Sequence, residues 1–253
     1  MWIVLSAESE SRPRRRRVSI FVPAYNEAAH LEGAIADIAA AAEAALEDHE
    51  ILLVDDGSSD GTGPLADFLA QQRPKLHVIH QPTNQGIAAG YTRAVEIARF
   101  EYFGFLPSDR EIDPTSIKDI LAAVGLAEIV VPYHGNPQAR HPYRRLLTRV
   151  STAVVNRLFG VRVRYFQGPC VYPTELARVL PKTAGGFYFV TQMLVHALCA
   201  GHAYVEVALF HQDRAHGRST AVSFKNIVKA LRTIAALWWT IRVRRAGTRK
   251  EGS

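Results

Sequence analysis

The chain has 253 residues, 48% of them apolar, which is enough for one well-buried domain and leaves little for a second. Its formal charge of +6 comes from the two ends, because residues 1–17 carry +3 and residues 242–253 carry +4; the near-neutral body does not indicate nucleic-acid binding. The only two cysteines, Cys170 and Cys199, are far apart, which argues against a disulfide framework or a zinc site.

Neither end predicts a membrane span. The opening apolar residues precede the arginines, the reverse of a secretory signal, and residues 233–241 form an apolar run far shorter than the about 20 residues that cross a bilayer. The basic ends suit an anionic lipid surface, and a disordered, solvated tail is an equal alternative for residues 1–17. We therefore expect a cytoplasmic protein with peripheral contact to the cytoplasmic face of the membrane.

From residue 18 onward, short β-branched or aromatic runs alternate with alanine-rich helical stretches. We predict strands at 18–22, 51–54, 76–80, 102–106 and 128–132, and helices at 28–46, 62–71, 86–100 and 114–124. Asp113 as N-cap and Pro114 at the first helical position mark the start of the last helix. The alternation predicts an α/β fold with a largely parallel sheet flanked by helices.

Each of the first four strands is followed by a polar loop, and these loops are PAYNE (23–27), DDGSSDGT (55–62), QPTNQG (81–86) and PSDRE (107–111). Ligands of open α/β sheets bind at the carboxyl ends of the strands, so the four loops predict a nucleotide site. A dinucleotide-dependent dehydrogenase is disfavoured because no GxGxxG follows the first strand.

The second half is less regular. It contains a basic loop and helix at about 134–160, a YFQGPCVYP segment (165–173), a helix at about 187–200 and a strand near 203–210. We expect this half to complete the acceptor side of the site.

VPAYNE (22–27), DDGSSDGT (55–62) and NQGIAAGYTRA (84–94) resemble the motifs of glycosyltransferase family 2, and within it the polyprenyl- or dolichyl-phosphate glycosyltransferases. The resemblance covers about residues 18–223. It implies a single GT-A domain that inverts the sugar configuration and uses a nucleotide-sugar donor, with nucleotide contacts at Pro23, Tyr25, Glu27, Asp56 and Gly86. Asp56 would accept from a ring N–H of uracil or guanine, Pro23 and Tyr25 would wall the base, and Glu27 would meet the ribose. The alternative for residues 55–60 is an Asx-type turn with no ligand.

The metal motif departs from the family, whose relatives carry Asp-x-Asp followed two residues later by Gln. Here Pro107 replaces the first Asp and Glu111 stands at the Gln position, so one carboxylate is lost and one gained. We expect Asp109 and Glu111 to hold Mg²⁺ or Mn²⁺, with nucleotide phosphates and water completing the coordination. Arg110 is a second candidate charge for the leaving diphosphate. The alternative is a degenerate, weakly metal-dependent or inactive site.

The chemical class of the acceptor is inferred from the absence of a general-base carboxylate. Many family members place a Glu or Asp in the helix after a Gly-Phe segment, whereas this chain has Thr191 and Gln192 there. A phosphate acceptor is already anionic and needs cations rather than a base. Arg144 and Thr148 match an Arg-x-x-x-Ser element of the lipid-phosphate-using relatives, so Arg144 is the main candidate for the acceptor phosphate and Arg140 the second. Arg145 and Arg149 are expected on a solvated face.

Two C-terminal features complete the assignment. Residues 211–220 resemble the family's Arg-x-x-Gly-x-Ser-Lys loop, which implies that Arg214 closes over the donor diphosphate; Thr220 stands where the family has Lys. Residues 224–245 place apolar side chains on one helical face and cations on the other, the pattern of an interfacial amphipathic helix, or of a helix packed on the domain or on a partner subunit.

The sequence therefore predicts a basic disordered tail (1–17), a GT-A domain (18–223), an interfacial helix (224–245) and a short tail (246–253). The predicted activity is sugar transfer from a nucleotide-sugar to a polyprenyl phosphate at the membrane surface, with Asp109, Arg144 and Arg214 as the catalytic residues. Two alternatives stay open: a family 2 enzyme that glycosylates a hydroxyl of a glycan or small molecule, and a non-catalytic nucleotide-sugar-binding relative.

Overall fold

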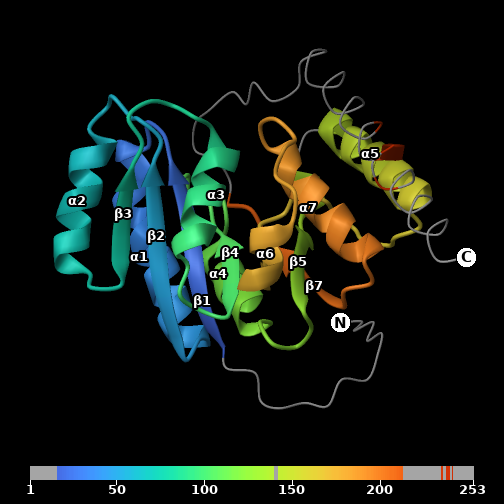
Figure 1. The fold of residues 1–253 in the computed structure, drawn as a ribbon, viewed down its shortest axis with the longest axis horizontal. Helices are drawn as coiled ribbons and strands as arrows, with labels where there is room; N and C mark the ends of the chain where they lie inside the picture. Colours follow the sequence, from blue (N-terminus) through green and yellow to red (C-terminus); the bar gives the residue numbers. More distant parts are fainter. Residues whose placement is uncertain (1–15, 140–141, 213–234, 236–237, 240, 242–253) are drawn as a thin grey trace, which may run out of the picture.

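A computed structural model describes residues 16–139, 142–212, 235, 238, 239 and 241 (Figure 1). At its centre lies a seven-stranded sheet of order β3-β2-β1-β4-β6-β5-β7. The strands are β1 (Arg17–Ala24), β2 (Asp48–Asp55), β3 (Leu76–His80), β4 (Tyr102–Phe105), β5 (Ile129–His134), β6 (Val171–Pro173) and β7 (Tyr204–Leu209). All neighbouring strands pair in parallel except β6, which is antiparallel to both β4 and β5.

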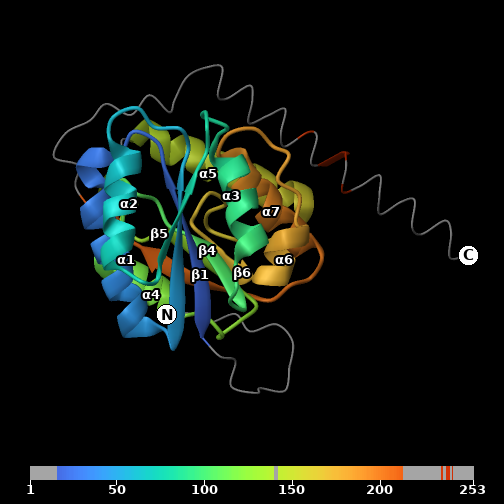
Figure 2. The ribbon, with the colours of Figure 1, turned by 60° about the vertical axis from the view of Figure 1, so that its left-hand side comes forward.

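Helices cover both faces of this sheet (Figure 2). The helices are α1 (Ala28–Ala45), α2 (Thr62–Gln72), α3 (Ile87–Ile97), α4 (Pro114–Ala122), α5 (Pro142–Phe159), α6 (Thr174–Val179) and α7 (Tyr188–Cys199), with a 3-10 turn η1 (Pro137–Ala139). One buried cluster joins α1, α2 and α4 to the sheet, and the other joins α3, α6 and α7 to the opposite face. The result is a three-layer α/β/α arrangement.

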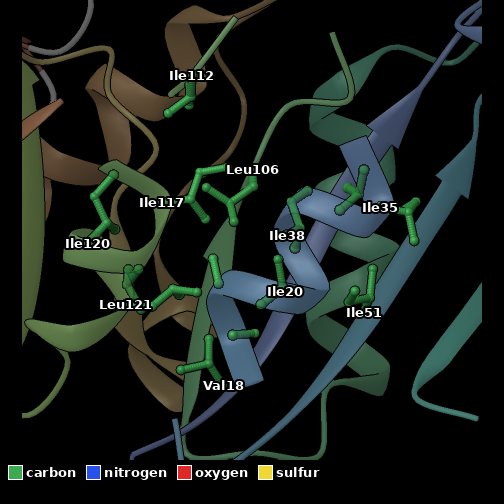
Figure 3. Packing of buried hydrophobic residues seen from close by; sticks show 14 of the residues in the cluster. Val18, Ile20, Ile35, Ile38, Ile51, Leu106, Ile112, Ile117, Ile120 and Leu121 are labelled. Atoms are coloured by element: carbon green, nitrogen blue, oxygen red, sulfur yellow. The ribbon is translucent and has the colours of Figure 1, made fainter. Parts of the chain in front are cut away.

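Alternation along β1 explains how one strand serves both layers. Val18 and Ile20 belong to the cluster under α1 and α4, whereas Phe21 belongs to the cluster under α3. Figure 3 shows Ile35 and Ile38 of α1 packed over the first of these faces. Because both faces of the sheet are covered, its central strands are nearly continuous runs of buried apolar residues.

The predicted strands and helices are confirmed with shifts of a few residues at their ends. Asp113 is an N-cap as expected, since its Oδ1 accepts a hydrogen bond from the backbone N of Thr115 at 2.8 Å. Strand β6 and helix α6 were not predicted. Three residues are too short a run to show a periodicity, and only pairing with β4 and β5 defines β6 as a strand.

The amino ends of the strands are held by a buried carboxylate. Glu50 of β2 is 1% exposed, and its Oε1 accepts from Ser19 Oγ at 2.6 Å and from the backbone N of Arg99 at 2.8 Å. Its Oε2 accepts from Arg99 Nε at 2.7 Å. Ser19 Oγ in turn accepts from the backbone N of Phe100. Glu50 therefore ties β1, β2 and the start of β4 together.

Within the described ranges, no helix combines the length and the apolarity that a membrane span requires.

Candidate functional site

The first two polar loops fold against each other at the carboxyl end of the sheet. The backbone N of Asn26, which has a φ of 56°, donates to Ser58 Oγ at 3.0 Å, and Ser59 N donates back to Asn26 Oδ1 at 2.9 Å. Asp60 accepts from the backbone N of Ala28 at 3.1 Å and from Thr62 N at 3.1 Å. Asp60 therefore supports the loops, as in the Asx-turn alternative, rather than offering a free carboxylate to a ligand.

These loops enclose a first cavity of about 230 Å³. Its lining includes all five residues predicted to bind the nucleotide, which are Pro23, Tyr25, Glu27, Asp56 and Gly86. Gln81 of the third loop and Ser108 also line it. They come from the ends of β1 and β2, the segment after β3, the start of α3 and the segment after β4. The packed tertiary structure thus brings together residues that are as much as 85 positions apart.

Asp56 is more heavily engaged than the sequence suggested. Its Oδ1 accepts from Gln81 Nε2 at 2.9 Å and from Gln85 N at 2.7 Å, and its Oδ2 accepts from Gly86 N at 2.8 Å. A carboxylate offers about four acceptor positions, so one remains for a ligand. Asp56 therefore shapes the start of α3, and its contact to a base stays a prediction.

His80, at the end of β3, bridges two carboxylates beside this cavity. Its Nδ1 lies 3.0 Å from Asp55 Oδ2 and its Nε2 lies 3.0 Å from Asp67 Oδ1 of α2. The bonds to Asp67 and Asp55 raise the pKa of His80. Burial alone would raise the pKa of Asp55, but hydrogen bonds from Ser58 and His80 outweigh it and lower that pKa. The His80 side chain thus joins the end of β3 to the end of β2 and to helix α2.

This bridge predicts a pH-dependent contribution to stability. Folding raises the pKa of His80. The stabilisation by the bridge is therefore complete below the pKa of the unfolded chain, about 6.5, and is lost as the pH rises through the higher pKa of the folded protein. We expect the free energy of unfolding of the wild type to exceed that of His80→Gln by at most about 1 kcal/mol near pH 6, since His80 and Asp67 are both well exposed. Urea unfolding between pH 6 and 9 measures it, and a difference that is constant or grows with pH contradicts the bridge.

A second cavity of about 300 Å³ lies next to the first. Pro107 and Asp109 line it, whereas Ser108 between them lines the first cavity, so the segment after β4 separates the two. Ser108 Oγ fixes this segment by donating to the carbonyl of Pro23 at 2.7 Å. Phe21 and Phe105, register partners on β1 and β4, line the first and second cavities respectively.

Asp109 and Glu111, the predicted metal ligands, line the second cavity together. Asp109 Oδ1 also accepts from the backbone N of Glu111 at 3.1 Å, so the two residues form one local turn. Oxygen ligands of this kind suit Mg²⁺ and Mn²⁺. No group of three or more His, Cys, Asp or Glu side chains capable of holding a metal occurs in the described part of the chain. Two carboxylates leave most of an octahedral coordination sphere to other ligands, so the role of Asp109 and Glu111 as metal ligands stays a prediction.

Arg110 does not take the role considered for it. It has a φ of 55°, and its Nε donates to Asp37 Oδ2 of α1 at 2.9 Å. The guanidinium lies over Gly33, where a Cβ would come within 2.7 Å of Arg110 Nη1. Arg110 lines neither cavity. The hypothesis that Arg110 faces the leaving diphosphate is therefore wrong, because the backbone turn directs its side chain to α1.

The lining of the second cavity also contains His134 and His211, which the sequence places in loops facing the site but which are not among the predicted site residues. His134 ends β5, and its Nδ1 lies 2.9 Å from Nε2 of His211, which follows β7. The ring of Tyr165 contacts His134 in a tilted arrangement, with a centroid distance of 4.2 Å and an interplanar angle of 50°. The signal for both is their position in the sequence: His134 is the last residue of β5 and His211 follows β7 by two residues, and the four polar loops also lie at strand ends.

Thr191 and Gln192 of α7 stand where relatives carry a carboxylate, and both support the fold. Gln192 Oε1 accepts from Ala184 N at 2.9 Å and its Nε2 donates to Thr183 Oγ1 at 2.9 Å. Thr191 Oγ1 donates to the carbonyl of Phe166. The residue just before α7 that lines the second cavity is Phe187.

The structure does not describe all of the predicted site residues. Arg140, Arg214 and nearly all of 224–245 lie outside the described residues. Arg144 and Thr148 both belong to helix α5, of which the Arg144 side chain is not described. The structure thus places two of the acceptor-phosphate candidates on one helix and leaves their contacts as predictions.

The comparisons with known proteins agree with this architecture. The model of glycosyl transferase family 2 matches residues 19–175. The chain belongs to glycosyltransferase family 2. It is 29% identical over 248 residues to polyprenol monophosphomannose synthase of Mycolicibacterium smegmatis, covering 92% of this chain and 90% of that protein. It is 26% identical over 247 residues to undecaprenyl-phosphate mannosyltransferase of Micrococcus luteus, covering 90% and 98%.

Solved structures of other sugar-transferring enzymes confirm the GT-A fold. Glucosyl-3-phosphoglycerate synthase from Mycobacterium tuberculosis, crystallised with Mn²⁺, UDP and phosphoglyceric acid, matches with a TM-score of 0.65 at 17% identity, covering 89% of this chain and 78% of that one. Mannosyl-3-phosphoglycerate synthase from Rubrobacter xylanophilus matches with a TM-score of 0.66 at 20% identity, covering 92% and 75%. With the family match, the predicted glycosyltransferase class is confirmed.

Proposed function

We propose that this glycosyltransferase moves a sugar from a nucleotide-sugar to a polyprenyl phosphate at the cytoplasmic face of a membrane, with inversion at the anomeric carbon. The observation that carries the proposal is a pair of cavities on the two sides of residues 107–109: the five predicted nucleotide contacts line the first, and Asp109 and Glu111 line the second. The two relatives that match nearly the full chain support the acceptor class, because both are named for sugar transfer to a polyprenyl phosphate.

The first cavity is the proposed donor nucleoside site. Pro23 and Tyr25 supply an apolar wall for the base, Glu27 reaches the ribose, and Asp56 offers its remaining acceptor position to a base N–H. Gly86, with a φ of 85°, begins α3 there and allows the backbone to approach the nucleotide closely. The diphosphate would then cross residues 107–109 toward the second cavity.

Asp109 and Glu111 are the proposed ligands of Mg²⁺ or Mn²⁺. When bound, a divalent ion neutralises charge that develops on a nucleoside diphosphate leaving group. The two side chains contribute anionic oxygens to the lining of the second cavity, and the turn that joins them keeps both there. Solved neighbours contain Mn²⁺ or Mg²⁺ together with UDP, which supports this assignment.

The acceptor phosphate is proposed to attack from the second cavity. One of its anionic oxygens forms the new bond to the anomeric carbon as the bond to the nucleoside diphosphate breaks on the opposite side, which inverts the configuration. No proton has to be removed from this nucleophile. That agrees with α7, which contributes Thr191 and Gln192 as structural residues instead of a carboxylate. Arg144, Arg140 and Thr148 are the proposed phosphate ligands, and Arg214 the proposed cation over the donor.

The proposed organisation is a GT-A domain at 18–223 followed by an interfacial helix at 224–245, between basic ends. The experiment that tests the acceptor is a transfer assay with radiolabelled nucleotide-sugars and vesicle-borne polyprenyl phosphate. A mannose nucleotide is the first donor to test, since both near full-length relatives are named for mannose. Label in the organic phase supports the proposal. Label only in water-soluble product supports a hydroxyl acceptor, and nucleotide binding without turnover supports a non-catalytic protein.

Arg144 gives this proposal a residue-level test. With a water-soluble short-chain prenyl phosphate, Arg144→Ala is expected to raise the KM for the acceptor by at least about tenfold and to leave the KM for the donor unchanged, because a bidentate charge-assisted contact is worth about 1.5–3 kcal/mol. Arg145→Ala on the same helix is the matched control. Equal acceptor KM values for the two variants would remove Arg144 from the acceptor site.

A further inference from the structure

Helix α5 presents a row of apolar residues to the outside of the molecule. Tyr143, Leu146, Val150, Val154 and Leu158 recur every three or four residues and are between 36% and 60% exposed. The opposite side of the helix contains Thr148, Thr152 and Asn156, which are partly buried, around the buried Val155. A helix on a water-exposed surface has the reverse arrangement. We call these five exposed residues the α5 ridge.

The α5 ridge is accompanied by positive charge only. The helix contains Arg144, Arg145, Arg149 and Arg157 and no aspartate or glutamate. Arg149 and Arg157 are exposed, and no described carboxylate forms an ion pair with either. An apolar ridge with cations beside it matches the boundary between acyl chains and anionic headgroups, where apolar side chains insert and arginine stems extend to the phosphates.

The charge of α5 disfavours a second copy of the chain as the occupant of the ridge, because a second copy would bring another cationic helix against the first. Residues 213–253 carry a net charge of +8, from ten Lys and Arg against two acidic residues, so they are not complementary in charge to α5. Ile241 nevertheless packs against the cluster that contains Val155, so coverage of the ridge by the chain itself is one of the outcomes that the test below distinguishes. An anionic lipid surface is complementary in charge and in polarity.

The position of α5 connects the ridge to the second cavity. The chain enters α5 shortly after Tyr133 and His134 and leaves it shortly before Tyr165 and Gln167, and all four residues line that cavity. Figure 1 shows α5 at the periphery of the molecule. A surface that binds the ridge would therefore lie beside the cavity proposed for the acceptor.

We propose that the α5 ridge is a membrane-docking surface, inserted at the headgroup level of an anionic bilayer, which brings the second cavity to the membrane. The inference rests on the proposed function for its biological purpose, since a polyprenyl acceptor is delivered from the bilayer. The contact itself is a property of α5 and is measurable without turnover.

The contact is tested with an environment-sensitive fluorophore on the full chain. Val154→Cys, on the ridge, and Val179→Cys, a 78% exposed valine on α6, are labelled in a Cys199→Ala background, since Cys170 is buried. Vesicles of phosphatidylcholine with one quarter phosphatidylglycerol are expected to shift the emission at 154 to the blue and to leave 179 unchanged. Unchanged emission at 154, or emission already shifted without vesicles, overturns the proposal; the latter means that protein covers the ridge.

A second pair of variants separates docking from chemistry. Leu146→Asp/Val150→Asp replaces two exposed ridge residues, and Leu126→Asp/Val179→Asp replaces two similarly exposed residues elsewhere. The ridge variant is expected to lose at least tenfold in transfer to vesicle-borne polyprenyl phosphate and to keep its rate on a soluble short-chain prenyl phosphate, whereas the control keeps both. Equal loss on both acceptors, or loss on neither, overturns docking by α5.

The same assays distinguish failure of the proposed function. If the wild type uses neither prenyl phosphate, the acceptor assignment fails, while a blue shift at residue 154 still establishes the membrane contact. If transfer occurs and the fluorophore does not respond, the acceptor assignment stands and the α5 proposal fails.

Discussion

Asp109→Ala is expected to lower the turnover of sugar transfer by about 10²–10³-fold, the usual cost of removing one preorganised stabiliser of developing charge. Asp109 lines the second cavity, and its neighbour Ser108 lines the first. Its loss removes one of the two carboxylates available for a divalent ion. Initial rates at saturating donor measure the effect.

Arg110→Asn is the matched control for this variant, because it changes the adjacent residue and asparagine tolerates the left-handed backbone found there. Since Arg110 pairs with Asp37 on α1, activity is expected to stay within about threefold of wild type. The role of the metal has an independent measurement. Nucleotide binding is titrated with Mg²⁺ or Mn²⁺ in the wild type and in Asp109→Ala, and coinciding curves would show that Asp109 is not a metal ligand.

The largest loss of stability is expected for Glu50→Ala, at about 2–5 kcal/mol in the free energy of unfolding. The substitution leaves the buried hydroxyl of Ser19 and the backbone N–H of Arg99 without their shared acceptor, and each such group costs about 1–3 kcal/mol. The Arg99 side chain is 62% exposed and regains water, so it adds little. Urea unfolding followed by circular dichroism measures the change.

Glu101→Ala provides the comparison for this stability prediction. Glu101 pairs with Arg17 nearby, but both side chains are substantially exposed, so removal is expected to cost less than about 1 kcal/mol. Similar losses for the two variants would show that the buried network does not contribute as described. Activity of folded Glu50→Ala is expected to be retained, because Glu50 lies at the amino ends of the strands, away from both cavities.

The first half of the fold was readable from local pattern. Parallel strands buried on both faces give continuous apolar runs such as those of β1 and β2, and each was followed by a polar loop. Strand β6 was not readable, because its antiparallel insertion between β4 and β5 depends on partners about 70 and 40 residues away.

In the candidate site, too, local motifs were predictable from the sequence and long-range contacts were not. The sequence identified Pro23, Tyr25, Glu27, Asp56 and Gly86 as a group, and the structure places all five around one cavity. It did not identify the His134–His211 pair, which forms only when β5 and β7 align in parallel. It also assigned Arg110 to the leaving diphosphate, whereas the side chain pairs with Asp37 of α1 from a backbone with a positive φ.

The sequence by itself determined the family, the glycosyltransferase class and the loops that form the candidate site, because motif chemistry and strand-end position are local properties of the chain. Only the tertiary structure decided which polar groups are already paired within the protein, as at Asp56, and which apolar residues face outward, as along α5. The physical reason is that hydrogen-bond saturation and exposure depend on neighbours in space. The sequence of α5 alone does not show which side of the helix faces outward. The structure shows that Thr148 and Thr152 lie on the inner side, around Val155, and that the other valines face outward.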